Sequence, residues 1–305
     1  MTAAEVLKYL QQEIHTTVAA TTDKDGLPVT CAIDMPAESG DSGGHKMKQI
    51  ERRMYLIQEL LKEQPEYEGI EIPEDEDGQK RLLRSLFNIR MPRPASREFL
   101  AVQDAYLQEE IQRRGITDLA GLQPVREGIY LWQGDITTLR CDAVVNAANS
   151  QMLGCFVPCH GCIDNAIHTF AGIQLRLACA ELMQQQGHEE ETGKAKITPA
   201  FNLTCRYVLH TVGPIAGGLL TKKDKDLLAS SYRSCLELAE QNNIKSIAFC
   251  CISTGEFHFP NEIAAEIAIQ TVNEYRERTN SRMEVIFNVF KKTDLNIYRK
   301  LLGAN

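Results

Sequence analysis

The chain has 305 residues, of which 43% are hydrophobic and 24% are charged, a balance typical of a folded globular protein with a sizeable core. Its formal net charge of −8 argues against broad binding to nucleic-acid backbones, because such binding requires a basic face. A single nucleotide-like ligand held by backbone amides is compatible with that charge.

The 10 cysteines suggest either secretion or metal binding. Glu5, Lys8 and Glu13 interrupt the start of the chain, so it lacks the apolar core of a signal peptide. No apolar run approaches the roughly 18 residues that cross a bilayer. We therefore expect a cytoplasmic protein without a membrane partner, in which clustered cysteines bind metal or take part in chemistry.

Residues 1–35 predict a short helix followed by a hairpin, with a turn signal from Asp23 to Gly26. This stretch resembles the opening of FMN-binding split barrels of the pyridoxamine-phosphate-oxidase type, but it ends after one hairpin. A flavin-holding barrel requires its remaining strands, so we expect only a partial split-barrel-like appendage here. Residues 36–46, PAESGDSGGHK, have the composition of a linker.

Residues 47–124 are predicted to be mostly helical. Apolar residues recur at helical spacing from Ile50 to Leu61, and an acidic stretch opened by a proline follows them. Two more helices are predicted over 81–88 and 96–114, separated by prolines that disfavour helix. We interpret this region as a packing or capping segment.

From 125 to 305, strand and helix patterns alternate. This alternation predicts an α/β domain, with a mixed, mainly parallel sheet covered by helices on both faces. The predicted strands lie at 129–132, 143–145, 195–199, 206–212, 246–252 and 283–289, and the predicted helices at 164–186, 224–241, 261–278 and from about 293.

Polar loops follow several of these strands. Gly134-Asp135-Ile136 follows the first strand, and Asn146-Ala-Ala-Asn149 lies at the end of the second. In open α/β sheets, ligands bind beyond the carboxyl ends of the strands. A third loop, from Ser253 to Pro260, leads into a helix and can direct several backbone N–H groups at a pyrophosphate.

A cysteine-rich segment, Cys155-Phe-Val-Pro-Cys159-His160-Gly-Cys162, lies before the next predicted helix. Three thiols and one imidazole within eight positions match the ligand chemistry of zinc. Four protein ligands would make the site closed and structural, whereas three would leave a position for water or substrate. Inert buried thiols are the remaining alternative.

The segments GDIT, VVNAAN and IDNAIH-x-x-AG resemble those of a macrodomain, the ADP-ribose-binding α/β fold. Hydrolytic macrodomains of the MacroD type carry a run of glycines before the corresponding helix, where this chain has C-F-x-P-x-H-x-C. That replacement resembles the zinc-containing macrodomain proteins of bacteria, a subfamily of protein-ADP-ribose hydrolases. The resemblance implies a three-layer macrodomain at 125–305, a helical extension at 47–124, and hydrolysis of mono-ADP-ribose from a modified protein side chain.

The resemblance also assigns roles to individual residues. It implies one Zn²⁺ ion held by Cys155, His160 and Cys162, with Cys159 excluded because it occupies the variable position of the motif. The implied catalytic residues are Asp164, Asn149 and His168. The implied substrate-binding residues are Asp135, Ile136, Asn146, Asn149, Ile163, Asp164, Ser253, Thr254, Gly255, Glu256 and Phe257.

These roles fit the chemistry of the side chains, although each also has a structural alternative. Asp135 can accept a hydrogen bond from the adenine amino group or cap a turn. Asn146 and Asn149 suit ribose hydroxyls, but one of them can instead hold the loop. Asp164 can orient a water or the scissile ribose, or cap the helix, and His168 one turn later is more often structural.

Two other classes of function remain open from the sequence. The protein can be a binding module whose pocket holds ADP-ribose without catalysis. Residues 1–35 suggest a flavin-linked oxidoreductase. Relatives of the zinc subfamily can occur alongside a sirtuin-like transferase and a lipoyl-carrier protein, which makes such a carrier a candidate substrate. No nucleic-acid partner is expected.

Overall fold

The structure is a computed structural model that describes residues 47–304. The predicted hairpin of 1–35 and the linker of 36–46 lie outside the described residues. The chain divides into two compact units, Met1–Leu83 and Arg84–Asn305, and their boundary falls within one helix. The boundary predicted after residue 124 stays a prediction.

The described part of the first unit is helical, as predicted. It contains α2 (Gln49–Lys62), the short η2 (Pro65–Tyr67) and the start of α3 (Glu76–Ile89). A buried arginine joins the two longer helices, since Arg53 Nε donates to Gln79 Oε1 over 3.0 Å. Helix α3 begins earlier than predicted because Asp75 accepts a hydrogen bond from the backbone N–H of Gly78, which stabilises its first turn.

The second unit contains a six-stranded sheet with the strand order β2-β8-β7-β4-β6-β5. All neighbouring strands are parallel except β5 and β6, which are antiparallel. The prediction of a mixed, mainly parallel sheet is therefore confirmed. The strands are β2 (Ile129–Gln133), β4 (Ala143–Ala148), β5 (Ala195–Pro199), β6 (Tyr207–Val212), β7 (Ser246–Phe249) and β8 (Glu284–Val289); a separate pair joins β1 (Thr117–Asp118) and β3 (Leu139–Arg140).

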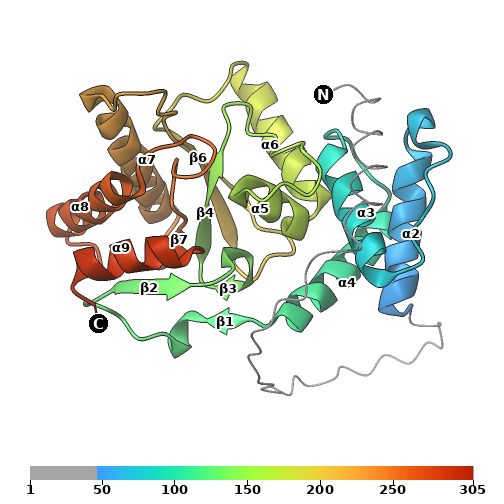
Figure 1. The fold of residues 1–305 in the computed structure, drawn as a ribbon, viewed down its shortest axis with the longest axis horizontal. Coiled ribbons are helices and arrows are strands. Elements are labelled where there is room, and N and C mark those ends of the chain that lie inside the picture. The colour runs from blue at the N-terminus through green and yellow to red at the C-terminus, as the bar shows by residue number, and fades with distance from the viewer. Residues whose placement is uncertain (1–46, 305) are drawn as a thin grey trace. The chain divides into compact units, whose positions relative to one another are not determined.

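Helices cover both faces of this sheet, which gives three layers (Figure 1). Helices α5 and α6 pack on one side and α7, α8 and α9 on the other. Within residues 47–304, no helix combines the length and the apolar composition that crossing a membrane requires. Besides the end of α3, the helices of this unit are α4 (Arg97–Arg114), η3 (Leu119–Gly121), η4 (Ile136–Thr138), α5 (Ile163–Ala171), α6 (Ile173–Gln186), α7 (Lys222–Gln241), α8 (Asn261–Thr279) and α9 (Lys292–Leu302).

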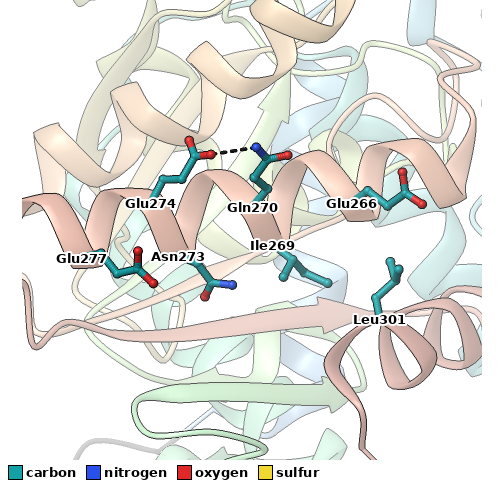
Figure 2. Close-up of a pocket in the computed structure, with 7 residues that line it drawn as sticks. All are labelled: Glu266, Ile269, Gln270, Asn273, Glu274, Glu277 and Leu301. Carbon is teal, nitrogen blue, oxygen red and sulfur yellow. Dashed lines mark hydrogen bonds between the residues drawn. The ribbon is translucent and has the colours of Figure 1, made fainter.

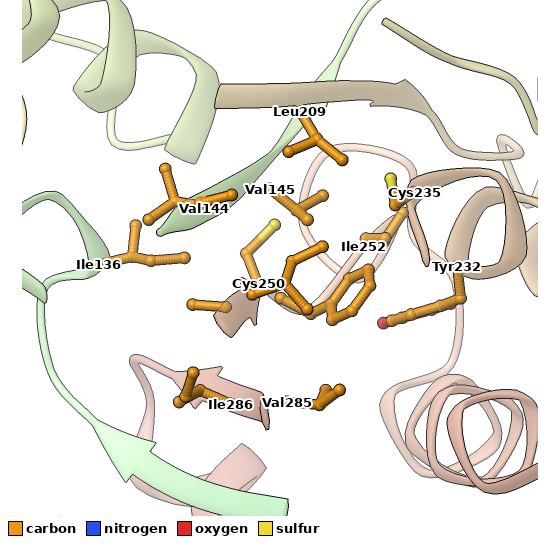
Figure 3. Close-up of a cluster of buried hydrophobic side chains, with 14 of the residues drawn as sticks. Ile136, Val144, Val145, Leu209, Tyr232, Cys235, Cys250, Ile252, Val285 and Ile286 are labelled. Carbon is orange, nitrogen blue, oxygen red and sulfur yellow. The ribbon is translucent and has the colours of Figure 1, made fainter. Parts of the chain in front are cut away.

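The core of this unit lies on the two faces of the sheet (Figure 3). The first half of β4 is apolar on both faces, as expected for a central parallel strand: Val144 and Val145 are consecutive and both fully buried. Figure 3 shows Val145 near Leu209 and Cys235, whereas Val144 lies toward Ile136. The buried sheet thus fixes the positions of the loops that leave its strand ends.

The prediction of one continuous helix over 164–186 is wrong. The structure has two helices, α5 and α6, separated by Gly172. Gly172 has φ +94°, a conformation that disfavours side chains, and a Cβ atom there would lie 2.7 Å from Gln103 Nε2. The break redirects the chain, so that α5 begins at the loop-bearing edge of the sheet and α6 runs along its side.

Residues 84–114 belong to the same compact unit as the α/β sheet. Arg176 of α6 holds the end of α3, since its Nη1 donates to the carbonyls of Asn88 and Arg90 over 2.7 and 2.6 Å. Helix α4 is held by Gln103, which bonds Gln174 and the backbone N–H of Ile173. The end of α3 and all of α4 therefore have fixed positions beside the sheet.

Candidate active site

A cavity of about 820 Å³ opens where the carboxyl ends of β2, β4, β7 and β8 meet. Its size suits a ligand as large as a dinucleotide-like molecule. It brings together most of the residues singled out in the sequence. Those that line it are Asp135, Ile136, Asn149, Cys155, His160, Cys162, Ile163, Asp164, Ser253, Thr254, Gly255, Glu256 and Phe257.

Asp135 follows β2 and caps the short helix η4. One carboxylate oxygen, Oδ1, accepts hydrogen bonds from the backbone N–H and the hydroxyl of Thr137 over 3.0 and 2.7 Å. The other, Oδ2, accepts from Arg114 Nη1 over 2.7 Å. Both oxygens are therefore fixed at the cavity wall, where lone pairs remain for a donor on a ligand.

Asn149 ends the polar loop after β4, and its side chain is tied to the segment that follows. Its Oδ1 accepts from the backbone N–H of Gln151 over 3.1 Å, and its Nδ2 donates to the carbonyl of Gly154 over 3.2 Å. It is half-buried and lines the cavity. This position allows its remaining polar capacity to meet a hydroxyl of a bound sugar.

Cys155, His160 and Cys162 converge at one point on the cavity wall. One ligand atom from each lies within 4.8 Å of the others, and Cys155 Sγ is 3.6 Å from His160 Nδ1. The hydrogen bond between the two thiols lowers the pKa of Cys155 and raises that of Cys162. Two sulfurs and one imidazole nitrogen match the preferences of zinc, and the exposure to the cavity fits an open coordination position.

Cys159 lies apart from this triad. Its Sγ is 3.3 Å from Ser85 Oγ, and its backbone N–H donates to Asn88 Oδ1 over 2.9 Å. Its φ of +52° turns the chain between the other ligand positions. The structure therefore groups Cys155, His160 and Cys162 without Cys159, and their role as metal ligands stays a prediction.

His160 also has a carboxylate neighbour. Its Nε2 lies 3.6 Å from Glu256 Oε1, whereas its Nδ1 is directed toward Cys155. Histidine ligands of metals commonly use the second ring nitrogen in this way, because a carboxylate there fixes the ring. Glu256 was predicted only as part of the phosphate loop, and the structure places it beside His160 as well.

Asp164 lies in the first turn of α5 and lines the cavity, although it is only 5% exposed. Burial raises its pKa to about 7, although the hydrogen bond from Asn146 Nδ2 opposes this shift. His168 Nε2 lies 3.6 Å from Asp164 Oδ1. Asn146 and His168 are both buried and are not among the residues that line the cavity, so their predicted contacts with substrate remain predictions.

The loop after β7 forms the opposite wall of the cavity. Ser253 has φ +65°, and its carbonyl accepts from the backbone N–H of Phe259 over 2.9 Å. These turns bring Thr254, Gly255 and Phe257 to the cavity between β7 and α8. Lys291, at the start of α9, lines the same cavity and supplies positive charge for an anionic ligand.

The cavity also contains residues that no sequence motif identified. Arg84 lies beside the cysteine-rich loop, with Nη2 donating to the His160 carbonyl over 3.1 Å and to Asn165 Oδ1 over 2.8 Å. Arg114 and Phe170 line the end near Asp135. Their helical patterns gave no signal, because periodicity shows that a helix forms and not which of its side chains reaches a distant loop.

A second hollow, of about 380 Å³, lies on the outer side of the helical layer between α8 and α9 (Figure 2). Three of its lining side chains are glutamates: Glu266, Glu274 and Glu277. None of these described lining residues is cationic, so the hollow is unsuited to a phosphate-bearing ligand. The cavity at the strand ends is the better candidate for a functional site.

Comparison with known proteins supports the cavity at the strand ends as the candidate functional site. The macro domain family matches residues 145–268. A protein-ADP-ribose hydrolase of Treponema medium is 61% identical over 261 residues, covering 84% of this chain and all of that protein, and one of Staphylococcus aureus (strain COL) is 49% identical over 256 residues, covering 83% and 96%. The crystal structure of a Trypanosoma brucei macrodomain in complex with ADP-ribose superimposes with a TM-score of 0.57 at 30% identity, covering 72% of this chain and 95% of that one.

The three lines of observation agree. The fold has the sheet and helix layers of the matched structures, the segment matched by the family contains the polar loops after β4 and β7, and the relatives are aligned over nearly their whole length. The chain belongs to the macrodomain family.

Proposed function

We propose that this protein is a zinc-dependent protein-ADP-ribose hydrolase that removes mono-ADP-ribose from a modified protein side chain. In this proposal, residues 125–305 form the macrodomain and 47–124 its helical extension. The observation that carries it is the convergence of Cys155, His160 and Cys162 on the same cavity wall as Asp164 and the nucleotide-binding loops. The relatives named protein-ADP-ribose hydrolase support the same reaction.

The lining of the cavity supports the following order for the parts of the substrate. Adenine is placed beside Asp135 and Ile136, where the carboxylate accepts from its amino group. The pyrophosphate lies against the backbone N–H groups of the loop from Ser253 to Phe257. This leaves the distal ribose beside Asn149 and Asp164, close to the cysteine-rich loop.

Cys155, His160 and Cys162 would hold one Zn²⁺ ion, with Glu256 fixing the imidazole of His160. When bound, zinc supplies polarisation of an oxygen, a lower pKa of a bound water, or orientation of the substrate. Asp164 orients the reacting ribose or a water, and its buried carboxyl can hold a proton near neutral pH. Asn149 fixes a ribose hydroxyl, and Phe257 packs against the distal sugar.

The substrate in this proposal is a mono-ADP-ribosylated protein. A lipoyl-carrier protein modified by a sirtuin-like transferase remains a prediction for its identity. A flavin-linked activity was suggested only by residues 1–35, which lie outside the described part of the chain.

The test measures the release of free ADP-ribose from a mono-ADP-ribosylated protein. Purified enzyme is assayed as prepared, after exhaustive chelation, and after zinc is restored. Release that is lost on chelation and regained with zinc supports the proposal. Tight binding of ADP-ribose without release would identify a non-catalytic binding module, and release unaffected by verified zinc removal would reject zinc dependence.

A further inference from the structure

Arg114 is the last residue of α4, yet its side chain reaches the adenine end of the cavity. Its Nη1 donates to Asp135 Oδ2 over 2.7 Å and to Thr137 Oγ1 over 3.0 Å. Its guanidinium lies over the ring of Phe170, 3.6 Å from the ring centroid. The side chain is therefore held by an ion pair and by stacking, in one orientation.

The hydrogen bonds of this guanidinium are directed at a single loop. Within residues 47–304, Nη1 of Arg114 donates two hydrogen bonds, both to this loop, and the buried Nε and Nη2 atoms have no acceptor among the protein atoms. These two contacts fix the carboxylate and the neighbouring hydroxyl of the loop after β2.

The contact between Arg114 and Asp135 restrains the carboxylate that Asp135 presents to a ligand. Thr137 holds one carboxylate oxygen and Arg114 the other, so the carboxylate cannot rotate freely. A carboxylate can only accept hydrogen bonds. It therefore accepts from the exocyclic amino group of adenine, whereas it repels the carbonyl oxygen that hypoxanthine carries at the same position.

We propose that Arg114 is a positioning residue that makes this cavity select adenine over 6-oxo purines, by fixing the carboxylate of Asp135. The inference rests on the proposed function for the location of the base. By this inference, the helical segment before the α/β domain contributes to substrate recognition, because α4 supplies the arginine. Loss of the guanidinium should weaken adenine binding and, above all, reduce the preference for adenine.

The experiment compares ADP-ribose with inosine diphosphate ribose, which differs only in the purine. Calorimetry measures the Kd of both for the wild type, Arg114→Gln, Arg114→Lys and the control Arg113→Gln. Arg113 is a neighbour on the same helix and forms ion pairs with Glu109 and Glu110. We expect the adenine preference to fall about tenfold in Arg114→Gln, the loss typical of a charged hydrogen bond, and to stay unchanged in Arg113→Gln.

Arg114→Lys keeps the positive charge but lacks the planar guanidinium. Compared with Arg114→Gln, it should therefore restore part of the ADP-ribose affinity and little of the adenine preference. In an Asp135→Asn background, adding Arg114→Gln should change the preference less than about twofold, because the two residues act through one contact. The KM for the modified protein should rise more than kcat falls in Arg114→Gln. Melting temperatures identify any variant that fails to fold, and Arg114→Lys then carries the comparison.

Equal weakening of both ligands in Arg114→Gln would overturn the inference, since it would show general attraction of the diphosphate. An unchanged Kd for both would overturn it as well. Calorimetry requires no turnover, so the two proposals can fail separately. Absence of ADP-ribose release, combined with an adenine preference that depends on Arg114, would reject the hydrolase and leave this inference standing.

Discussion

The side-chain amide of Asn146 donates a hydrogen bond to Asp164 Oδ1 over 2.7 Å, and both residues are buried. The same amide nitrogen lies 3.1 Å from His210 Nδ1. Asn146 is fully buried behind the cavity wall, whereas Asp164 lines the cavity. This arrangement favours a role for Asn146 in orienting the carboxylate, in place of direct contact with the substrate.

Asn146→Ala removes that donor and leaves the buried carboxyl without its orienting partner. We expect kcat to fall by about tenfold to a hundredfold, since a small misplacement of a reacting group has effects of this order. The Kd for ADP-ribose should change much less, because the base and pyrophosphate contacts proposed above come from other loops. Single-turnover assays and calorimetry measure the two quantities.

Asn273→Ala, at the outer hollow shown in Figure 2, is the matched control and should leave both quantities unchanged. A rise in the Kd of Asn146→Ala that accounts for the whole loss of kcat/KM would indicate direct substrate contact. In that case the role predicted from the motif would be correct and the positioning role would be wrong.

The cysteine-rich loop offers a second test with a matched pair of thiols. Cys155→Ser removes one of the three convergent ligand atoms, whereas Cys159→Ser changes a thiol that lies beside Ser85. We expect Cys155→Ser to lose bound zinc and turnover while keeping measurable ADP-ribose affinity, and Cys159→Ser to keep about one zinc per chain. Elemental analysis and calorimetry on protein prepared with ample zinc check both statements.

The same experiment distinguishes an open site from a closed one. Loss of zinc in Cys159→Ser would indicate four protein ligands and a structural ion. Full zinc content in Cys155→Ser would remove this residue from the ligand set. His160→Ala and Cys162→Ala should behave as Cys155→Ser does, because their ligand atoms belong to the same cluster.

The sequence predicted the order of elements in the α/β unit, because each buried strand is a short apolar run between turn residues. It failed at Gly172, where apolar residues continue across a backbone break that only the positive φ reveals. One glycine inside a helical pattern is ordinarily tolerated, so the pattern gave no reason to end the helix there.

The candidate site was predictable where its residues follow one another along the chain, as Cys155, His160 and Cys162 do. Arg114 was not predicted, since it lies 21 positions before Asp135 and belongs to another helix. The burial of Asn146 could not be read from a motif either. Polar residues at a strand end suggest a ligand, but packing decides which of them face the cavity and which support it.

Gly172 gives a prediction about stability. Gly172→Ala would force a side chain into φ +94° and bring its Cβ within 2.7 Å of Gln103 and Gln174. We expect the free energy of unfolding to fall by about 1–3 kcal/mol. The control Gly217→Ala lies in open space without a positive φ and should change it by less than about 0.5 kcal/mol. Equal urea midpoints for the two variants would contradict the assignment of strain to Gly172.

A buried histidine gives the last prediction, on the pH dependence of stability. His210 is 1% exposed, and burial lowers its pKa to about 3, so it stays neutral in the folded protein under mildly acidic conditions. In the unfolded chain its pKa is about 6.5, so the unfolded state gains a proton that the folded state does not as the pH falls below that value. This term is negligible above about pH 7.5 and increasingly destabilises the folded state from there toward pH 3.

The protonation of Asp164 changes the free energy of unfolding in the opposite direction. Its pKa is raised to about 7, so the folded state binds this proton at a higher pH than the unfolded state does. The wild type and His210→Gln share the contributions of Asp164 and His168, which therefore cancel when the two proteins are compared. Between about pH 7.5 and 5.5, the wild type should lose about 1.4 kcal/mol of unfolding free energy more than the variant. Urea denaturation at both pH values measures the difference. Parallel losses would mean that His210 takes up its proton in the folded protein, and that its buried setting does not keep it neutral.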